Sequence, residues 1–256
     1  MGTTGMTTPQ FPAATPQAIG LSEGQRIVNT FADPPKTFTD LKRYPTWWVP
    51  WLLLSVFSYL LVFAVAQKVG FEQVTQNQMR LNRRQAERME QMPPDQRARA
   101  VQLSVTITKA ISYCYPVVLL IFLAVIALVL MVTFNFGMGQ EIGFAQSMAV
   151  VTYAHLPGII RGILAAVSLY AGASPEGFNF ENPLASNLGA LIDVMEHPVL
   201  YRLGSAIDVF TIWVLILTGI GFACVSKLKR STSLAVVFGW YALITLAGMG
   251  FAAAFS

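Results

Sequence analysis

The sequence predicts an all-α polytopic membrane protein with five transmembrane helices and a polar helical hairpin between the first and second spans. Of the 256 residues, 54% are hydrophobic and only 12% are charged, a balance outside the soluble globular range. The basic residues cluster beside apolar segments, as expected for contact with anionic lipid headgroups. A helical span takes about 20 mostly apolar residues. Five such segments occur, at about residues 47–66, 111–136, 146–170, 203–226 and 234–255.

The first segment of the chain, residues 1–30, is expected to be a disordered N-terminal tail. It is rich in Thr, Pro, Gly and Gln and has few large apolar residues, so it cannot form a core. A short helix over residues 22–30, stopped at Asp33-Pro34, is the alternative for its last part. The membrane domain is expected to cover residues 31–256. No basic start followed by an apolar core precedes it, so we expect the first span to target the chain to the membrane.

The first span, residues 47–66, contains no charged residue. Trp47, Trp48 and Trp51 lie at its start, and tryptophan is enriched at the headgroup level. We therefore predict that these three side chains anchor the helix at one membrane interface.

The polar hairpin is predicted over residues 68–109, as two helices parted by Pro93-Pro94. No aromatic residue lies among its arginines, which argues against nucleic-acid binding and places the hairpin outside or against the bilayer. These arginines are Arg80, Arg83, Arg84, Arg88, Arg97 and Arg99.

The third span, residues 146–170, carries His155, Pro157 and Arg161 in its interior. Proline removes a helix hydrogen bond and favours a kink, and Gly158 and Gly162 are spaced for close helix packing. A charged residue at mid-membrane costs about 2.5–3.5 kcal/mol on insertion scales, so Arg161 needs a partner or water. This pattern fits a functional polar niche within the membrane. It also fits a purely structural role, in which Arg161 forms an ion pair or extends its side chain to the membrane interface.

The fourth span, residues 203–226, contains Asp208 in its first turns. With the third span running outward and the fourth inward, the rise of 1.5 Å per residue brings Arg161 and Asp208 to similar depths. We therefore predict a contact between them. Loss of one partner would then cost more than loss of both, because the survivor would be left unpaired.

Orientation is judged from the basic residues near the spans. Lys42 and Arg43 precede the first span, and Lys227 to Arg230 form a short basic turn on the same side. Short loops carry most of the positive-inside signal, so we predict a cytoplasmic N-terminus and an external C-terminus. Cys114 and Cys224 fall at the ends of different apolar segments, and we expect two free thiols.

Four short stretches occur in order along the chain, namely Asp33-Pro34-Pro35-Lys36-Thr37-Phe38, Trp47-Trp48-Val49-Pro50, Tyr153-Ala154-His155-Leu156-Pro157 and Ile207-Asp208-Val209-Phe210. These stretches and the order of the spans resemble the Yip family of Ypt/Rab-interacting membrane proteins, particularly its bacterial branch. The resemblance covers about residues 31–256. It implies an integral protein of the bacterial inner (cell) membrane with a cytoplasmic N-terminus. The Asp-Leu-Tyr-Gly-Pro and Gly-Tyr motifs of eukaryotic members are absent, so Rab binding does not carry over.

Two functions are consistent with the sequence. The first is a non-enzymatic scaffold or membrane-organising protein, because no catalytic set, P-loop or metal-binding cluster is found. The alternative is a small transporter or channel with a polar niche around His155, Arg161 and Asp208. An intramembrane enzyme is disfavoured because Glu141, His155 and Asp208 are predicted at different depths. We expect no cofactor and no nucleic acid. The expected partners are the lipid bilayer, anionic lipids, and a second copy or another membrane protein.

Overall fold

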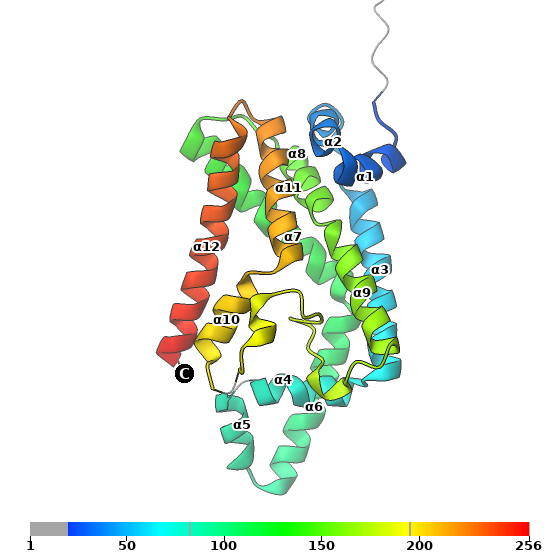
Figure 1. Cartoon of the computed structure of the whole chain (residues 1–256), viewed down its shortest axis with the longest axis vertical. Helices are drawn as coiled ribbons and strands as arrows, with labels where there is room; N and C mark the ends of the chain where they lie inside the picture. Colours follow the sequence, from blue (N-terminus) through cyan, green and yellow to red (C-terminus); the bar gives the residue numbers. More distant parts are fainter. Residues whose placement is uncertain (1–19, 82, 195, 256) are drawn as a thin grey trace, which may run out of the picture.

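Helices account for nearly all regular structure in the computed structural model, which describes residues 20–81, 83–194 and 196–255. The prediction of an all-α fold is confirmed, since no strand occurs in these ranges and the one β-bridge, Asn187 to Asp208, is isolated. Most helices run along the long axis of the molecule, and the first described residues and the C-terminal end of the last helix lie toward opposite ends of it (Figure 1). Among the described residues, four helices are long and apolar enough to cross a membrane, namely Trp48–Lys68, Tyr115–Gly137, Phe144–Tyr170 and Arg230–Gly250.

The N-terminal helices α1 (Glu23–Ala32) and α2 (Pro34–Leu41) lie at one end of the bundle, and α2 is seen end-on in Figure 1. The expected tail over residues 1–30 therefore ends earlier than predicted, while residues 1–19 lie outside the described part. The Ser22 side chain caps α1 in a reciprocal capping box with Gln25. Arg26 and Thr30 of α1 are buried, so α1 is held by tertiary contacts that the composition of the segment does not indicate.

The polar segment lies at the other end of the molecule, after α3 (Trp48–Lys68) (Figure 1). We expected two helices here, but the described residues form α4 (Phe71–Leu81), α5 (Arg83–Glu90) and α6 (Pro94–Tyr113). Pro94 begins α6, where its missing N–H is not needed. Figure 1 shows α4 and α5 pointing in different directions, a change that no proline or glycine in this part of the sequence indicates.

The second apolar segment forms α7 (Tyr115–Val132) and a π-helical turn, η1 (Thr133–Gly137). It begins four residues later than the predicted start at residue 111, because α6 and α7 meet at Cys114, which has φ −86° and ψ 5°. The third segment is split into α8 (Phe144–Ala154) and α9 (Pro157–Tyr170). Residues 147–154 of α8 are all buried, so this helix occupies the centre of the bundle.

The predicted span 203–226 is not one helix. The chain forms 3₁₀ turns η2 (Pro175–Gly177) and η3 (Leu188–Leu191), then α10 (Pro198–Ala206) and α11 (Val209–Val225). At 1.5 Å per residue α11 is about 25 Å long, shorter than the roughly 30 Å hydrocarbon core of a bilayer. Figure 1 shows α10 and the preceding loop between α9 and α12 (Arg230–Phe255), below α11.

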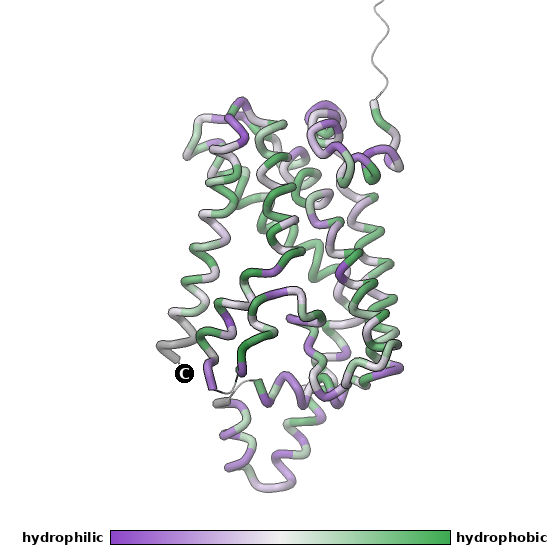
Figure 2. Tube along the Cα trace, viewed as in Figure 1, coloured by the Kyte–Doolittle hydropathy of each residue, from purple (hydrophilic) through white to green (hydrophobic). Residues whose placement is uncertain are grey.

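The core is formed where α2, α7, α8 and α11 meet. Its fully buried side chains include Phe38, Leu123, Val151 and Phe222. Burial of each such side chain contributes about 1.5–3 kcal/mol. Figure 2 shows that hydrophobic residues dominate the long helices, whereas hydrophilic residues gather at the ends of the bundle and in the polar segment. This distribution matches a bundle that contacts hydrocarbon along its length.

Candidate functional site

Asp208 marks the break between α10 and α11. Its side chain is buried, and it caps α11 by accepting a hydrogen bond from the Thr211 backbone N–H at 2.9 Å. It also accepts hydrogen bonds from the hydroxyl groups of Thr211 and Ser186. A carboxylate at a helix N-terminus also interacts favourably with the helix dipole. The acid that we expected inside a span therefore begins a helix instead.

The loop before α10 is held against this cap by its own polar side chains. The Val209 N–H donates to the Ser186 carbonyl at 3.1 Å, next to the bridge between Asn187 and Asp208. The Asn187 amide donates to the Asn182 side chain at 2.5 Å, and Asn182 also reaches the Tyr201 hydroxyl at 3.4 Å. The Tyr241 hydroxyl of α12 donates to the Ala206 carbonyl at 2.8 Å, which satisfies a carbonyl at the helix break. The irregular backbone between α10 and α11 is thus hydrogen-bonded both by the loop before α10 and by α12.

Arg161 of α9 reaches the same loop but does not bind Asp208. Its Nη2 donates to the Glu181 carbonyl at 3.2 Å, while its buried Nε has no hydrogen-bond partner. The expected direct contact with Asp208 is therefore wrong, although the two charges are near enough to interact electrostatically. The physical reason is that the Asp208 carboxylate oxygens already accept hydrogen bonds from Ser186 and Thr211. The guanidinium group of Arg161 binds the Glu181 carbonyl of the loop instead.

His155 lies at the break between α8 and α9 and has other neighbours. Its Nδ1 is 2.7 Å from the Val151 carbonyl, and its ring meets that of Phe122 edge-on at 6.3 Å. No hydrogen bond or ion pair joins His155, Arg161 and Asp208, all three of which lie in the described part of the chain. The three residues of the predicted niche thus face different surroundings.

Pro157 is the first residue of α9 and Gly158 follows it, where a Cβ would lie 3.8 Å from Leu54 of α3. Gly162 faces open space. Helix α11 approaches its neighbours closely at Gly219 and Gly221. A Cβ at Gly219 would lie 2.5 Å from Leu234, and one at Gly221 would lie 2.4 Å from Val150.

The three tryptophans at the start of α3 divide into two kinds. Trp48 is exposed, as an interfacial anchor would be. Trp47 and Trp51 are partly buried against the core, with ring centroids 6.5 Å apart. The Trp51 indole N–H donates to the Pro116 carbonyl at 3.0 Å, which joins α3 to α7.

A buried ionic cluster at the N-terminal end was missed by sequence reasoning. Arg26 is 4% exposed and donates to Asp40 at 2.7 Å and to Glu23 at 2.8 Å. Its Nη1 also bonds the Thr46 hydroxyl, at 2.5 Å, and the Tyr153 hydroxyl of α8 donates to Glu23. Burial opposes the charge, but the hydrogen bond to Asp40 and the nearby carboxylates raise the pKa of Arg26. The capping sequence from Ser22 to Gln25 was a signal by which α1 could have been predicted. No sequence pattern indicated that Arg26 would meet Asp40 and Thr46, which lie far from it along the chain.

These features define a multi-pass helical integral membrane protein with an ordered N-terminal cap. The chain belongs to the Yip1 domain family, whose model matches residues 28–252. No curated protein and no solved structure is detectably similar to it.

No group of three or more His, Cys, Asp or Glu side chains able to hold a metal occurs among the described residues. Cys114 and Cys224 are both free thiols.

Proposed function

We propose that this protein is a non-enzymatic scaffold of the bacterial cell membrane, which binds protein partners on the surface formed by α1 and α2. The chain would cross the bilayer five times, with α10 and α11 together forming the fourth pass. The N-terminus would be cytoplasmic, on the side of the basic turn from Lys227 to Arg230. A role in membrane association without catalysis agrees with the family to which the chain belongs.

The observation that carries the proposal is the ionic cluster around Arg26, because it fixes two amphipathic helices rigidly on the membrane bundle. Beside this cluster lies a surface cleft of about 470 Å³, lined among others by Asp33, Lys36, Arg43 and Tyr44. Charges of both signs next to an aromatic ring are typical of polar protein interfaces. Pre-ordering of such a surface lowers the entropic cost of binding a partner.

The test uses a photo-crosslinking residue placed at Lys36 or Arg43, both exposed, with the same probe at Arg99 of α6 as the matched control. After illumination of native membranes, we expect discrete adducts with other proteins from positions 36 and 43 only. The same adducts should vanish in Arg26→Ala, which releases α1 while the membrane bundle stays folded. Equal adducts from all positions, or adducts that persist in Arg26→Ala, would contradict a specific surface.

The alternative, a small transporter or channel, is favoured by one observation. The Asp208 cap begins α11 beside Tyr241, about 16 Å along α12 from Arg230, and broken helices near mid-membrane are common in transporters. Against it, His155, Arg161 and Asp208 line neither the cleft beside the N-terminal helices nor the pocket between α3 and α9. Ion or proton flux into liposomes that is lost in Asp208→Asn would favour the transporter over the scaffold.

A further inference from the structure

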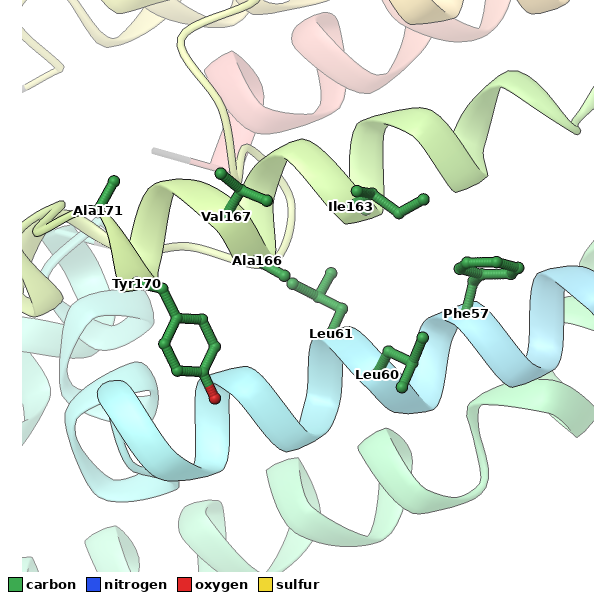
Figure 3. A pocket seen from close by; sticks show the side chains of 9 residues that line it. Phe57, Leu60, Leu61, Ile163, Ala166, Val167, Tyr170 and Ala171 are labelled. Carbon is green, nitrogen blue, oxygen red and sulfur yellow. The ribbon is translucent and has the colours of Figure 1, made fainter.

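An apolar groove runs between α3 and α9 on the outer surface of the bundle. It has a volume of about 390 Å³, and its lining is almost entirely apolar. Figure 3 shows Leu60 and Leu61 of α3 on one side and Ile163, Ala166 and Val167 of α9 on the other. Gly162 also lines the groove, and a Cβ built there meets no atom within 4 Å.

The length of the groove corresponds to one leaflet of a bilayer. Along α9 the lining residues extend from Gly162 to Ala171, a rise of about 14 Å at 1.5 Å per residue. Half of the hydrocarbon core of a bilayer is about 15 Å thick. A single acyl chain in the groove would therefore extend from the end of α3 to the middle of the membrane.

The outer end of the groove carries a cation. Lys68 is exposed, and its Nζ lies 4.6 Å from the centroid of the Tyr170 ring, which lines the groove. Lys68 forms no ion pair with a described residue. The aromatic ring positions the ammonium group without neutralising it. A phosphate at this level would meet an uncompensated positive charge.

We propose that this groove binds one anionic phospholipid, with an acyl chain over Gly162 and Ala166 and its phosphate at Lys68. The lipid would belong to the leaflet opposite to α1 and α2, because α3 crosses the membrane once between them. The combination of an apolar channel of leaflet length with a free ammonium at its mouth fits this ligand better than a second protein copy. A second copy would place two Lys68 groups near each other across a symmetric interface. This site is independent of the proposed scaffold function.

The test measures retained lipid by native mass spectrometry after transfer from nanodiscs that contain phosphatidylglycerol and phosphatidylcholine in equal amounts. We expect the wild-type protein to retain one phosphatidylglycerol in preference to phosphatidylcholine. Gly162→Leu fills the groove and should lower retention of both lipids five- to tenfold. Lys68→Gln should remove the headgroup preference and leave weak retention of both.

Matched controls separate the site from general effects on the membrane surface. Gly239→Leu adds the same side chain to α12, where a Cβ also has open space, and Lys109→Gln removes another lysine placed over an aromatic ring. Both should retain lipid as the wild type does, and all variants should keep the wild-type melting temperature. Equal retention of both lipids by the wild-type protein would overturn the proposal. A protein dimer that dissociates in Gly162→Leu would overturn it as well, by assigning the groove to a second copy.

Discussion

The Tyr153 hydroxyl of α8 donates a hydrogen bond to the Glu23 carboxylate of α1. This bond joins the centre of the membrane bundle to the N-terminal helix. Glu23 also pairs with Arg26, so the bond extends the ionic cluster into the bundle. The N-terminal helices are therefore a fixed part of the fold.

Replacing Tyr153 by Phe tests this link. The variant keeps the buried ring but leaves Glu23 short of one donor, at a cost of about 1.5–3 kcal/mol for a bond to a charged group. We expect faster hydrogen exchange in α1, with α9 and α12 unchanged. Tyr170→Phe, which alters an exposed ring of α9, is the control. Unchanged exchange in α1 would show that the bond is not formed in the membrane.

Removal of the charge at the centre of the cluster should have a larger effect. Arg26→Ala leaves Glu23 and Asp40 without their cation, and breaking a buried pair in this way costs about 3–5 kcal/mol. Because both carboxylates are partly exposed, we expect the lower end of this range. Arg26→Lys should rescue only part, since a single ammonium cannot reproduce the guanidinium fork. Thermal unfolding in detergent measures the loss, with exposed Arg43→Ala as the neutral comparison.

Asn77 of α4 is 4% exposed and donates to the carbonyls of Pro175 and Phe178, at 2.8 and 2.9 Å. These bonds hold the polar segment to the loop after α9. Asn77→Ala leaves both carbonyls without this donor, and we expect a loss of about 1–3 kcal/mol. Limited proteolysis near η2 should accelerate. Gln102→Ala, which changes an exposed amide of α6, is the control. If Gln102→Ala accelerated cleavage equally, Asn77 would have no special role.

The cap formed by Asp208 leads to a prediction about its coupling to Arg161. Asp208→Ala should lose about 0.5–2 kcal/mol by removing an N-cap, and Asp208→Ser should recover most of it. Because no ion pair joins the two residues, adding Arg161→Gln should change this cost by less than about 0.5 kcal/mol. A coupling energy well above that value, measured in a double-mutant cycle, would restore the direct ion pair.

The close approach of α11 to its neighbours gives a steric prediction. A methyl group at Gly221 would lie 2.4 Å from Val150 and 3.0 Å from Phe38, so Gly221→Ala forces the core apart. Overpacking of this kind costs about 1–3 kcal/mol. Gly162→Ala adds the same group where there is open space and should be tolerated. Unfolding of the two variants in detergent compares them directly, and equal stability would contradict the packing.

The sequence alone predicted the fold class, because apolar segments of span length need only composition and length to be recognised. It also indicated the helix break near Pro157, since a missing N–H is a local property of the chain. The Asp208 position was visible as an acid among apolar residues, but its role as a helix cap was not. That role depends on Ser186 and on a loop that returns to the same depth.

The tertiary structure alone decided the partners of the charged residues. Arg26 meets Asp40 and Thr46 because α1, α2 and the start of α3 fold over the end of α8, and no periodicity in the sequence encodes that approach. Arg161 bonds a backbone carbonyl, which every residue carries and no side-chain pattern can reveal. Local hydrophobicity thus determined which segments are apolar helices, whereas long-range packing determined which polar groups meet.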